Sequence, residues 1–312
     1  MTDAHTENTP QEGEFAAAEL ARHADPKRRD RDSDRVRFES LPPFIGDILH
    51  GTDAAQEALL SLLTLRTDVA ESQVVYERQQ REVASDQAAI VQAAIRRGLE
   101  LDVNAPVGDE ERKRVTQLKL RNQPVDDDGL RLLAGLNALE ELDLDGTKVT
   151  DSGLVHVASL ANLQELLLNN TQVTDAGLEH LAKLANLQEL VLDNTKVTDA
   201  GLAHLAKLAK LQRLWLDYTQ VTDGGLAHLA SLANLQELTL SYTQVTDAGL
   251  VHLAALANLH ELALVGTQVT DAGLAHLNAL KNLQTLSLDD TQVTDAGVAK
   301  LQAAIPNCEI SH

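Results

Sequence analysis

The sequence predicts an α/β solenoid, in which short parallel strands and helices alternate and stack into a curved horseshoe. Three observations predict it. From residue 115 onward the sequence repeats every 24 residues, the hydrophobic spacing changes within each repeat, and the apolar residues are nearly all aliphatic. Aromatic residues are 2% of the 312-residue chain, although apolar residues are 44%. A core of leucine, valine and alanine is typical of a stack of equal units.

The repeats begin at Val115, which opens a degenerate unit, and end in a half-repeat over residues 307–312. Eight units of 24 residues precede that half-repeat, and we assign residues 112–312 to one repeat domain. A leucine opens each of the other seven units: Leu139, Leu163, Leu187, Leu211, Leu235, Leu259 and Leu283. One unit cannot bury its own leucines, so neighbouring units must stack.

Each unit changes its hydrophobic period halfway. Leucines first alternate, as at Leu190 and Leu192, which is the period of a strand with one buried face. Apolar residues then recur at three and four positions through V-T-D-A-G-L-x-H-L-A-x-L, which is the spacing of a helix. Parallel strands pair at about 4.8 Å, whereas helix axes need about 8 to 10 Å. We therefore expect the sheet on the concave side and the helices on the convex side.

The repeat resembles leucine-rich repeats with helical convex sides, as in the ribonuclease-inhibitor-like and cysteine-containing classes, and residues 199–206 (D-A-G-L-A-H-L-A) resemble the core of bacterial GALA-type repeats. The resemblance covers about two thirds of the chain and implies the horseshoe fold. The chain departs from this family where Asn or Cys is expected after L-x-L-x-x. Seven units have threonine there: Thr147, Thr171, Thr195, Thr219, Thr243, Thr267 and Thr291. A hydroxyl both donates and accepts, so we expect a threonine ladder in place of the asparagine ladder.

Three further columns recur at the same spacing, and we expect a structural role for each. The glycines, from Gly129 to Gly297, are expected to allow close packing against the neighbouring strand. Thr198 or Asp199 is expected to be the N-cap of its helix, and the aspartates before the glycines, from Asp151 to Asp295, are interpreted as helix-cap residues. The histidines stand parallel and do not converge on one point, so we predict no metal site. They are His156, His180, His204, His228, His252 and His276.

The sequence contains none of the common catalytic motifs, such as G-x-S-x-G, G-x-x-x-x-G-K-[ST] or H-E-x-x-H. Its single cysteine, Cys308, falls in the last predicted strand beside Ile310, where we expect it to pack rather than react. We therefore predict that the protein is not an enzyme and needs no cofactor.

Two segments precede the repeats. Residues 1–40 contain few apolar side chains and a mixed charge run at 27–35, so we predict a disordered tail. Residues 41–111 are predicted to be helical, with one helix over 54–65 and a second over 69–97. A solenoid needs its open end covered, and we assign this helical region the role of a cap.

Charge and cysteine content limit the partners and the compartment. Lys and Arg number 26 against 47 Asp and Glu, a net charge of −21, which disfavours binding to nucleic acids and to anionic membranes. Residues 1–14 lack the features of a leader, and no segment is apolar for the length that a bilayer needs. A single cysteine forms no intrachain disulfide, so we expect a cytoplasmic protein. We also expect a monomer.

Side chains that vary on the exposed strand face are expected to carry the function, because the other repeat positions hardly change. Between the strand leucines, three neighbouring units have Leu167, Val191 and Trp215, which we expect to form an exposed apolar stripe. Tyr218 and Tyr242 follow just beyond the strands.

A column of glutamates, broken by Arg213, flanks this stripe, and its nearest members are Glu165, Glu189 and Glu237. We predict that the stripe, the tyrosines and these charged residues bind a partner protein. An apolar residue of the partner is expected to pack on Trp215 while its basic residues meet the glutamates. Neutral drift at solvent positions is the alternative, although an exposed tryptophan is uncommon without a use.

Two other functions remain open. The segment L-P-P-F-I-G-D-I-L at 41–49 resembles the L-P-x-x-I opening of an F-box, which GALA-type proteins can carry. The resemblance would imply a ubiquitin-ligase adaptor that recognises substrates with its repeats, but the match then slips by one residue and the later V-C-x-x-W part is missing. The near-identity of the third to seventh units also fits a consensus-like scaffold without an evolved ligand.

Overall fold

The computed structural model describes the backbone of residues 53–98 and 107–312, and the side chains from residue 72 onward within these ranges. The predicted tail over 1–40 and the F-box-like segment over 41–49 lie outside the described residues. The chain divides into two units between residues 79 and 80, and the repeats belong to the second unit.

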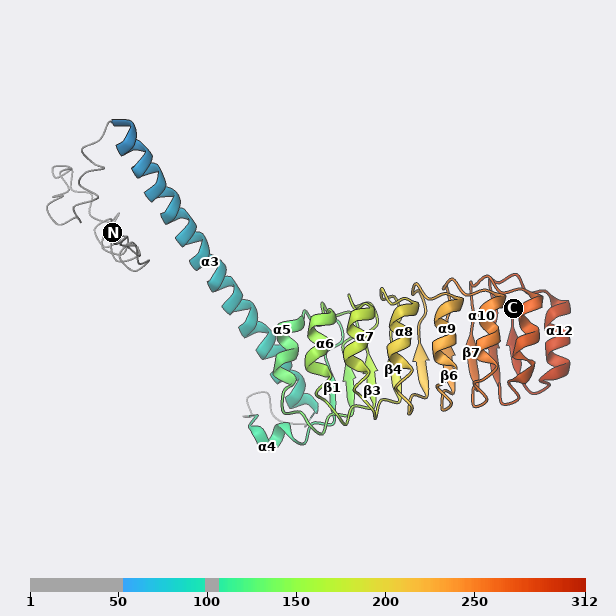
Figure 1. Cartoon of the computed structure of the whole chain (residues 1–312). Coiled ribbons are helices and arrows are strands. Elements are labelled where there is room, and N and C mark those ends of the chain that lie inside the picture. The colour runs from blue at the N-terminus through green and yellow to red at the C-terminus, as the bar shows by residue number, and fades with distance from the viewer. Residues whose placement is uncertain (1–52, 99–106) are drawn as a thin grey trace, which may run out of the picture. The chain divides into compact units, whose positions relative to one another are not determined.

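Helix α3 spans Asp53–Gly98 and is one helix of 46 residues (Figure 1). The prediction of two helices, over 54–65 and 69–97, is therefore wrong. The three residues between them include no glycine or proline, so no helix breaker separates the two segments. The helix ends at Gly98 with Arg96 and Arg97 in its last turn, where positive charge interacts favourably with the helix dipole.

Within residues 107–312, nine strands form one open, curved, parallel sheet in chain order (Figure 1). Pairing joins residues 24 positions apart, as Leu190 pairs with Leu166 and with Leu214. The strands are β1 (Gln117–Lys119), β2 (Glu141–Asp143), β3 (Glu165–Leu167), β4 (Glu189–Val191), β5 (Arg213–Trp215), β6 (Glu237–Thr239), β7 (Glu261–Ala263), β8 (Thr285–Ser287) and β9 (Glu309–Ser311). Equivalent residues of successive repeats therefore pair with one another in the sheet.

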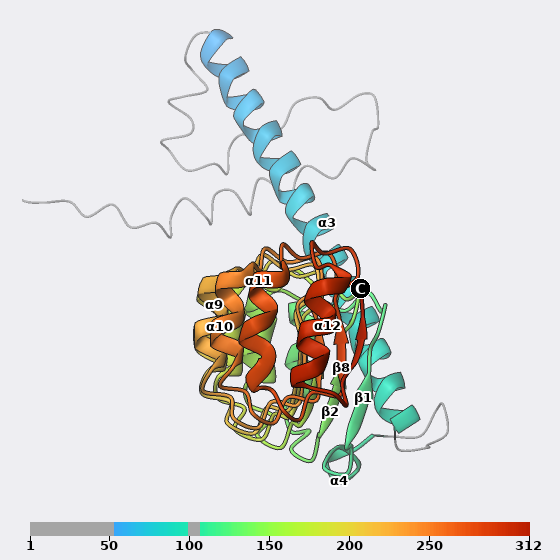
Figure 2. The same cartoon turned by 90° about the vertical axis from the view of Figure 1, so that its right-hand side faces the viewer.

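Helices follow the strands and lie on one face of the sheet (Figure 2). They are α5 (Asp127–Leu130) with η2 (Arg131–Leu133), α6 (Asp151–Val157), α7 (Asp175–Leu181), α8 (Asp199–Leu205), α9 (Asp223–Leu229), α10 (Asp247–Leu253), α11 (Asp271–Leu274) with η3 (Ala275–Ala279), and α12 (Asp295–Ala304), while α4 (Asp109–Arg112) precedes β1. The predicted fold class, with a concave parallel sheet and convex helices, is confirmed.

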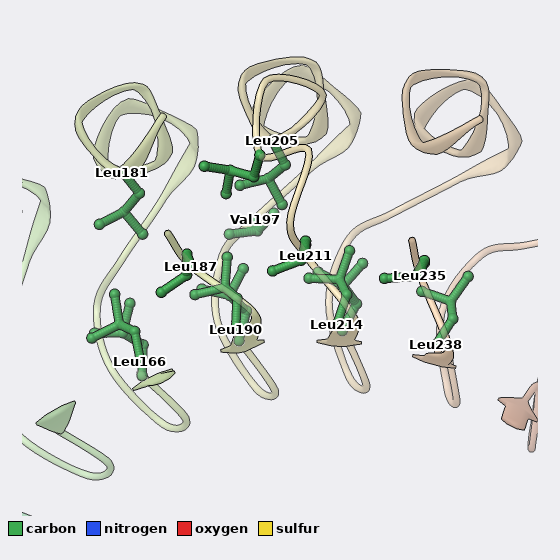
Figure 3. Close-up of a cluster of buried hydrophobic side chains, with 14 of the residues drawn as sticks. Leu166, Leu181, Leu187, Leu190, Val197, Leu205, Leu211, Leu214, Leu235 and Leu238 are labelled. Carbon is green, nitrogen blue, oxygen red and sulfur yellow. The ribbon is translucent and has the colours of Figure 1, made fainter. Parts of the chain in front are cut away.

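The core lies between the two layers and consists almost entirely of leucine and valine (Figure 3). The middle residue of each strand points toward the helices, as Leu190 and Leu214 do, and helix leucines such as Leu205 meet it from the other side. These three side chains are fully buried. Burial of one leucine contributes about 1.5 to 3 kcal/mol. The fold is therefore stabilised by many similar layers rather than by one central contact.

An aspartate and a threonine join consecutive helices at their N-termini. Thr198 is the N-cap of α8, because its side-chain oxygen accepts a hydrogen bond from Ala200 N (3.3 Å). Asp175, one repeat earlier, accepts twice from Thr198: Oδ1 from the backbone N (2.8 Å) and Oδ2 from Oγ1 (2.6 Å). The same bonds recur at each such aspartate from Asp127 to Asp271. Of the two candidate caps, the threonines cap the helices. The interpretation of the aspartates as caps is wrong, because they bind the next repeat.

The glycine column leaves space for these aspartates. A Cβ atom on Gly201 would lie 2.5 Å from Asp175 Oδ1, and one on Gly225 would lie 2.5 Å from Asp199 Oδ1. Either separation is too short for a carbon and an oxygen that are not bonded. The expected reason for the glycines, packing against a neighbouring strand, is wrong, since the group that needs the space is the carboxylate of the preceding repeat.

Helix α3 supplies the first member of this series. Gln87 Oε1 accepts a hydrogen bond from Asp126 N (3.4 Å) and occupies the space where a Cβ on Gly129 would lie. The glutamine thus stands where an aspartate of a preceding repeat stands elsewhere. Val91 and Ile95 of the same helix are buried in one core cluster with the repeat leucines. The last turns of α3 therefore cover the first repeat, while the domain boundaries drawn from the sequence stay predictions.

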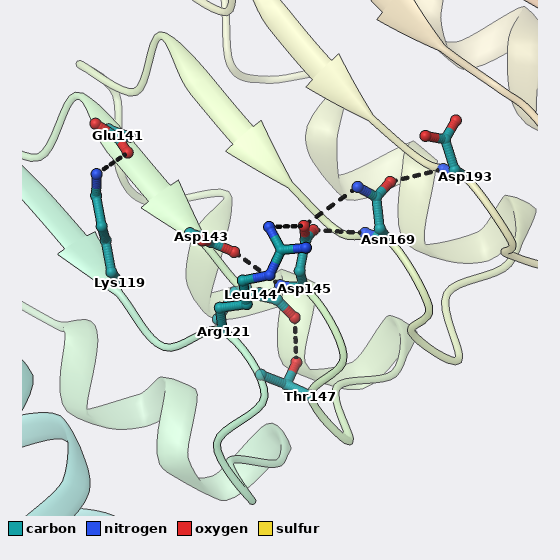
Figure 4. Close-up of polar contacts among 9 residues, drawn as sticks. All are labelled: Lys119, Arg121, Glu141, Asp143, Leu144, Asp145, Thr147, Asn169 and Asp193. Carbon is teal, nitrogen blue, oxygen red and sulfur yellow. Dashed lines mark hydrogen bonds and ion pairs between the residues drawn. The ribbon is translucent and has the colours of Figure 1, made fainter.

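The threonine column does not join repeats. Thr195 Oγ1 donates to Leu192 O of its own repeat (2.6 Å), and the same bond recurs at each threonine from Thr147 to Thr291. The predicted threonine ladder is therefore wrong. Each hydroxyl closes the turn after its own strand, as Figure 4 shows for Thr147.

A ladder between repeats does exist two positions before the threonines. Asp145 accepts hydrogen bonds from Asn169 N (2.9 Å) and Nδ2 (3.2 Å), and Asn169 Oδ1 accepts from Asp193 N (2.9 Å), as Figure 4 shows. Asp193 Oδ1 then accepts from Asp217 N (2.9 Å). Asp217 Oδ1 accepts from Ser241 N (2.7 Å). Carboxylate and amide side chains thus satisfy the backbone donors of the next turn.

Candidate functional site

The residues predicted to bind a partner come from four neighbouring strands and two turns. Strand pairing places one row across β3 to β6: Glu165, Glu189, Arg213 and Glu237. It places a second row two residues further along each strand: Leu167, Val191 and Trp215. The turns after β5 and β6 carry Tyr218 and Tyr242. Both rows lie on the face of the sheet away from the helices, because side chains alternate along a strand.

The apolar row is only partly exposed. Trp215 is 36% exposed, whereas Val191 is 1% exposed and Leu167 is half-buried. The expectation of an exposed stripe is wrong for Val191, since its two partners in the sheet, Leu167 and Trp215, are both larger and stand on either side of it. Val191 is therefore buried next to the tryptophan, and Trp215 is the apolar residue available to a partner.

Thr239 follows Trp215 in the same row. Its Oγ1 is buried and has no hydrogen-bond partner within the part of the chain that the structure describes. Burying a hydroxyl without a partner costs about 1 to 3 kcal/mol. The unpaired hydroxyl of Thr239 therefore lowers the stability of the strand next to Trp215.

Thr239→Val is expected to raise the free energy of unfolding by about 1 kcal/mol, because the variant removes that unpaired hydroxyl. Thr243→Val is the matched control. Thr243 Oγ1 donates to Leu240 O (2.6 Å), so its loss is expected to lower the free energy of unfolding by about 1 kcal/mol. Urea denaturation measures both, and a change of the same sign in the two variants would contradict the assignment.

Arg213 crosses the glutamate row. Its Nε donates to Glu189 Oε2 (2.5 Å), and its guanidinium lies 3.6 Å from Glu165 Oε1. A partner's basic residue would therefore share these two glutamates with Arg213. Glu237 makes no ion pair within residues 72–98 and 107–312. Burial, and then the charges of neighbouring glutamates, raise the pKa of Glu165 and of Glu237, so negative charge is in excess along this row.

Tyr218 and Tyr242 form a stacked pair. Their ring centroids lie 4.6 Å apart with the planes 12° from parallel, and the side chains are 57% and 44% exposed. The Tyr242 hydroxyl donates to Asp290 Oδ2 (3.3 Å), and a Cβ on Gly266 would lie 2.5 Å from the Tyr242 ring. Trp215 does not join the stack, since among the described side chains the two tyrosines alone make an aromatic ring contact.

Both tyrosines occupy a backbone position with positive φ, 56° at Tyr218 and 55° at Tyr242. The other repeats have residues that tolerate this conformation at the same position: Asn122, Gly146, Asn170, Asn194, Gly266 and Asp290. A bulky side chain disfavours the left-handed region. Sequence reasoning missed this feature, although a column of Asn, Gly and Asp interrupted by two tyrosines is readable from the aligned repeats.

The turn before Tyr218 lies against an aspartate with a raised pKa. Burial, together with the charges of Asp217 and Asp145, raises the pKa of Asp193 to about 6, although the hydrogen bond from Asp217 N lowers it. Asp193 Oδ2 accepts no hydrogen bond from any residue that the structure describes. A cation placed beside this carboxylate would therefore be stabilised.

Other chemistry is scarce on the described surface. Among the described residues, no three His, Cys, Asp or Glu side chains are grouped so that they would hold a metal ion. Nor does that part of the chain contain a helix with the length and apolar character needed to cross a bilayer. Cys308 is 4% exposed and directly precedes β9 rather than lying within it. Its burial raises the pKa of the thiol, which disfavours the reactive thiolate.

Family comparisons identify the repeat. The family described as Leucine Rich repeats (2 copies) matches residues 161–207. The family described as Leucine Rich repeat matches residues 136–158, 231–254 and 279–301. None of the curated proteins matches the chain.

Solved structures agree with the family matches. The chain is similar to internalin C2 from Listeria monocytogenes, with 27% identity and a TM-score of 0.57 over 71% of this chain and 92% of that one. It is also similar to a second internalin (inlF) of the same organism, with 25% identity and a TM-score of 0.55 over 72% of this chain and 67% of that one. Together with the parallel sheet and its 24-residue register, these matches confirm the resemblance seen in the repeats. The chain is a leucine-rich-repeat protein.

Proposed function

We propose that this protein is a non-catalytic interaction module that binds a partner protein on the concave strand face, with Trp215 at the centre of the contact. Leucine-rich-repeat proteins are in general protein-interaction modules, and their curved sheets offer extended binding surfaces. The observation that carries the proposal is the chain's one tryptophan, 36% exposed on a strand in the middle of the sheet. Exposed aromatic residues supported by packed neighbours are common anchors of protein contacts.

The partner is expected to combine an apolar anchor with basic residues. The apolar residue would pack on Trp215, in the row that also contains half-buried Leu167. Glu237 lies next to Arg213 in the charged row and Glu261 follows it on the next strand, and the whole chain has a net charge of −21. A basic partner is therefore favoured both at long range and at contact.

The test compares retention of proteins from a lysate by the wild-type chain and by the Trp215→Ala, Tyr242→Ala double variant. A protein retained by the wild type is expected to be lost with the double variant, because the aromatic surface is removed. Val251→Ala is the matched control, since Val251 is 49% exposed on helix α10, away from the strand face. It is expected to retain the partner.

Melting temperatures of the three proteins separate binding from folding. The double variant is expected to melt close to the wild type, because neither aromatic side chain belongs to the buried core cluster. Equal retention by wild type and double variant would refute the concave site and redirect attention to the helices or the N-terminal region. Retention of nothing by any of them would favour a scaffold without an evolved ligand.

The remaining assignments belong to the same proposal. A cytoplasmic monomer without a cofactor, which binds neither nucleic acid nor membrane, is consistent with the charge and the single cysteine. Size-exclusion chromatography with light scattering would test the monomer, and a mass near twice 33.7 kDa would contradict it.

A further inference from the structure

The fold does not require the two stacked tyrosines. Their backbone position has positive φ, and the other repeats place Asn, Gly or Asp there. Tyr218 and Tyr242 adopt the same conformation although bulky side chains disfavour it. Both rings are exposed, so they contribute little to the core. Residues held in a disfavoured backbone conformation are often found at ligand-binding sites.

The stack is held from one side. Gly266 leaves space for the Tyr242 ring, Asp290 accepts a hydrogen bond from its hydroxyl (3.3 Å), and Tyr218 lies on Tyr242 with a centroid distance of 4.6 Å. Tyr242 belongs to the repeat that follows Tyr218 and covers one face of its ring. The uncovered face of Tyr218 is therefore turned toward the preceding repeat.

The preceding repeat also supplies a carboxylate at the turn that leads into Tyr218. Asp193 Oδ1 accepts from the N of Asp217, the residue immediately before Tyr218 (2.9 Å), while its Oδ2 has no donor among the described residues. Asn194 donates from Nδ2 to Asn170 Oδ1 (2.6 Å), so its amide is held toward the repeat before. Within the described chain, no cation lies on either tyrosine ring. A π surface and a negative charge thus occur at neighbouring turns, and no cation of the described chain pairs with either of them.

We propose that the uncovered face of Tyr218 and the carboxylate of Asp193 together bind an arginine side chain of the partner protein. A guanidinium is planar, so it stacks on a ring while its edge donates to a carboxylate. A lysine ammonium has no planar face, and an apolar side chain has no charge. The net charge of −21 favours the approach of a basic segment. This inference rests on the proposed function, since it names a residue type of the bound partner.

The test uses the full chain and three short peptides. The chain has three tyrosines, so ring-labelled tyrosine gives three NMR signals, with Tyr76 as the internal control. Acetyl-Gly-Arg-Gly-amide is expected to shift the signals of Tyr218 and Tyr242 and to leave that of Tyr76 in place. The citrulline peptide keeps the shape and removes the charge, and it is expected to bind at least about tenfold more weakly. Equal binding of the citrulline peptide would overturn the role of charge, and equal binding of the lysine peptide would overturn the choice of guanidinium.

Variants test the two groups separately. Asp193→Asn keeps the Oδ1 acceptor, and Tyr218→Asn introduces the residue that Asn194 has at the same position. Each is expected to weaken binding of the arginine peptide about tenfold or more without lowering the melting temperature. Asp289→Asn is the matched control, because Asp289 has the same position in its own repeat as Asp193 but lies three repeats after Tyr218. This variant is expected to bind the arginine peptide like the wild type. The proposal would be overturned if Asp193→Asn bound the arginine peptide as well as the wild type. It would also be overturned if Tyr218→Asn lowered the melting temperature, because the ring would then stabilise the fold.

The outcomes separate this inference from the proposed function. The peptide titration needs no partner protein. The arginine site alone would be refuted if the Trp215→Ala, Tyr242→Ala variant lost the partner while the arginine peptide shifted no tyrosine signal of the wild type. The Trp215-centred contact alone would be refuted if the arginine peptide shifted the tyrosine signals of the wild type while the double variant still retained the partner.

Discussion

Gly225→Ala is expected to lower the free energy of unfolding by about 2 to 4 kcal/mol. A Cβ on Gly225 would lie 2.5 Å from Asp199 Oδ1. That carboxylate joins two repeats, because it accepts from Thr222 N (2.7 Å) and Thr222 Oγ1 (2.6 Å). The added methyl group must displace it, which breaks two charge-assisted hydrogen bonds at a helix N-terminus.

Gly224→Ala, one residue earlier, is the matched control and is expected to raise the free energy of unfolding by about 0.5 to 1 kcal/mol. Neighbouring repeats have Ala200 and Ala248 at this position, so a methyl group fits. Urea denaturation at one pH compares the two variants. Near-equal stabilities would contradict the role of the carboxylate, and in an Asp199→Ala background the effect of Gly225→Ala is expected to disappear largely.

Asp193→Asn is expected to raise the free energy of unfolding at pH 7.5 by about 1 to 3 kcal/mol. Burial raises the pKa of Asp193 from 3.8 to about 6, so its ionised form destabilises the folded state at neutral pH. Asn169 has an amide at the same position one repeat earlier and accepts the equivalent hydrogen bond from Asp193 N. The substitution therefore keeps the ladder and removes the buried charge.

The pH dependence of this effect has a definite sign. Because the pKa of Asp193 is higher in the folded state, the folded protein binds more protons than the unfolded chain between pH 3.8 and about 6. The advantage of asparagine is full above that window and shrinks as the pH falls through it. Urea denaturation of both proteins at pH 7.5 and 5.0 measures the difference. An advantage that does not change between these two pH values would exclude ionisation of Asp193 as its cause.

The same substitution links stability to binding. If Asp193 holds a partner's arginine, Asp193→Asn gains stability and loses affinity for the arginine peptide together. Binding sites often retain a destabilising charge for this reason. A purely structural aspartate would change stability without changing the peptide titration, so the two measurements on one variant decide between the roles.

The pattern within one repeat was sufficient to predict the elements. The leucines that alternate at Leu190 and Leu192 predicted the strand β4, and the Thr-Asp pair before the three- and four-residue spacing predicted the start of α8 at Thr198. Both predictions are confirmed, because they depend on which side chains of a single unit face the core. The outward positions of Trp215 and Arg213 followed from the same alternation.

Only the tertiary structure decided which side chains meet between repeats. Asp175 binds Thr198 rather than its own helix, and Val191 is covered by its larger neighbours in the sheet. The stack of Tyr218 on Tyr242 likewise joins two turns. These contacts depend on the distance and rotation between neighbouring units, which are set by how the leucine layers pack. A sequence repeat determines the identity of the residues in each unit, but not the geometry by which one unit lies on the next.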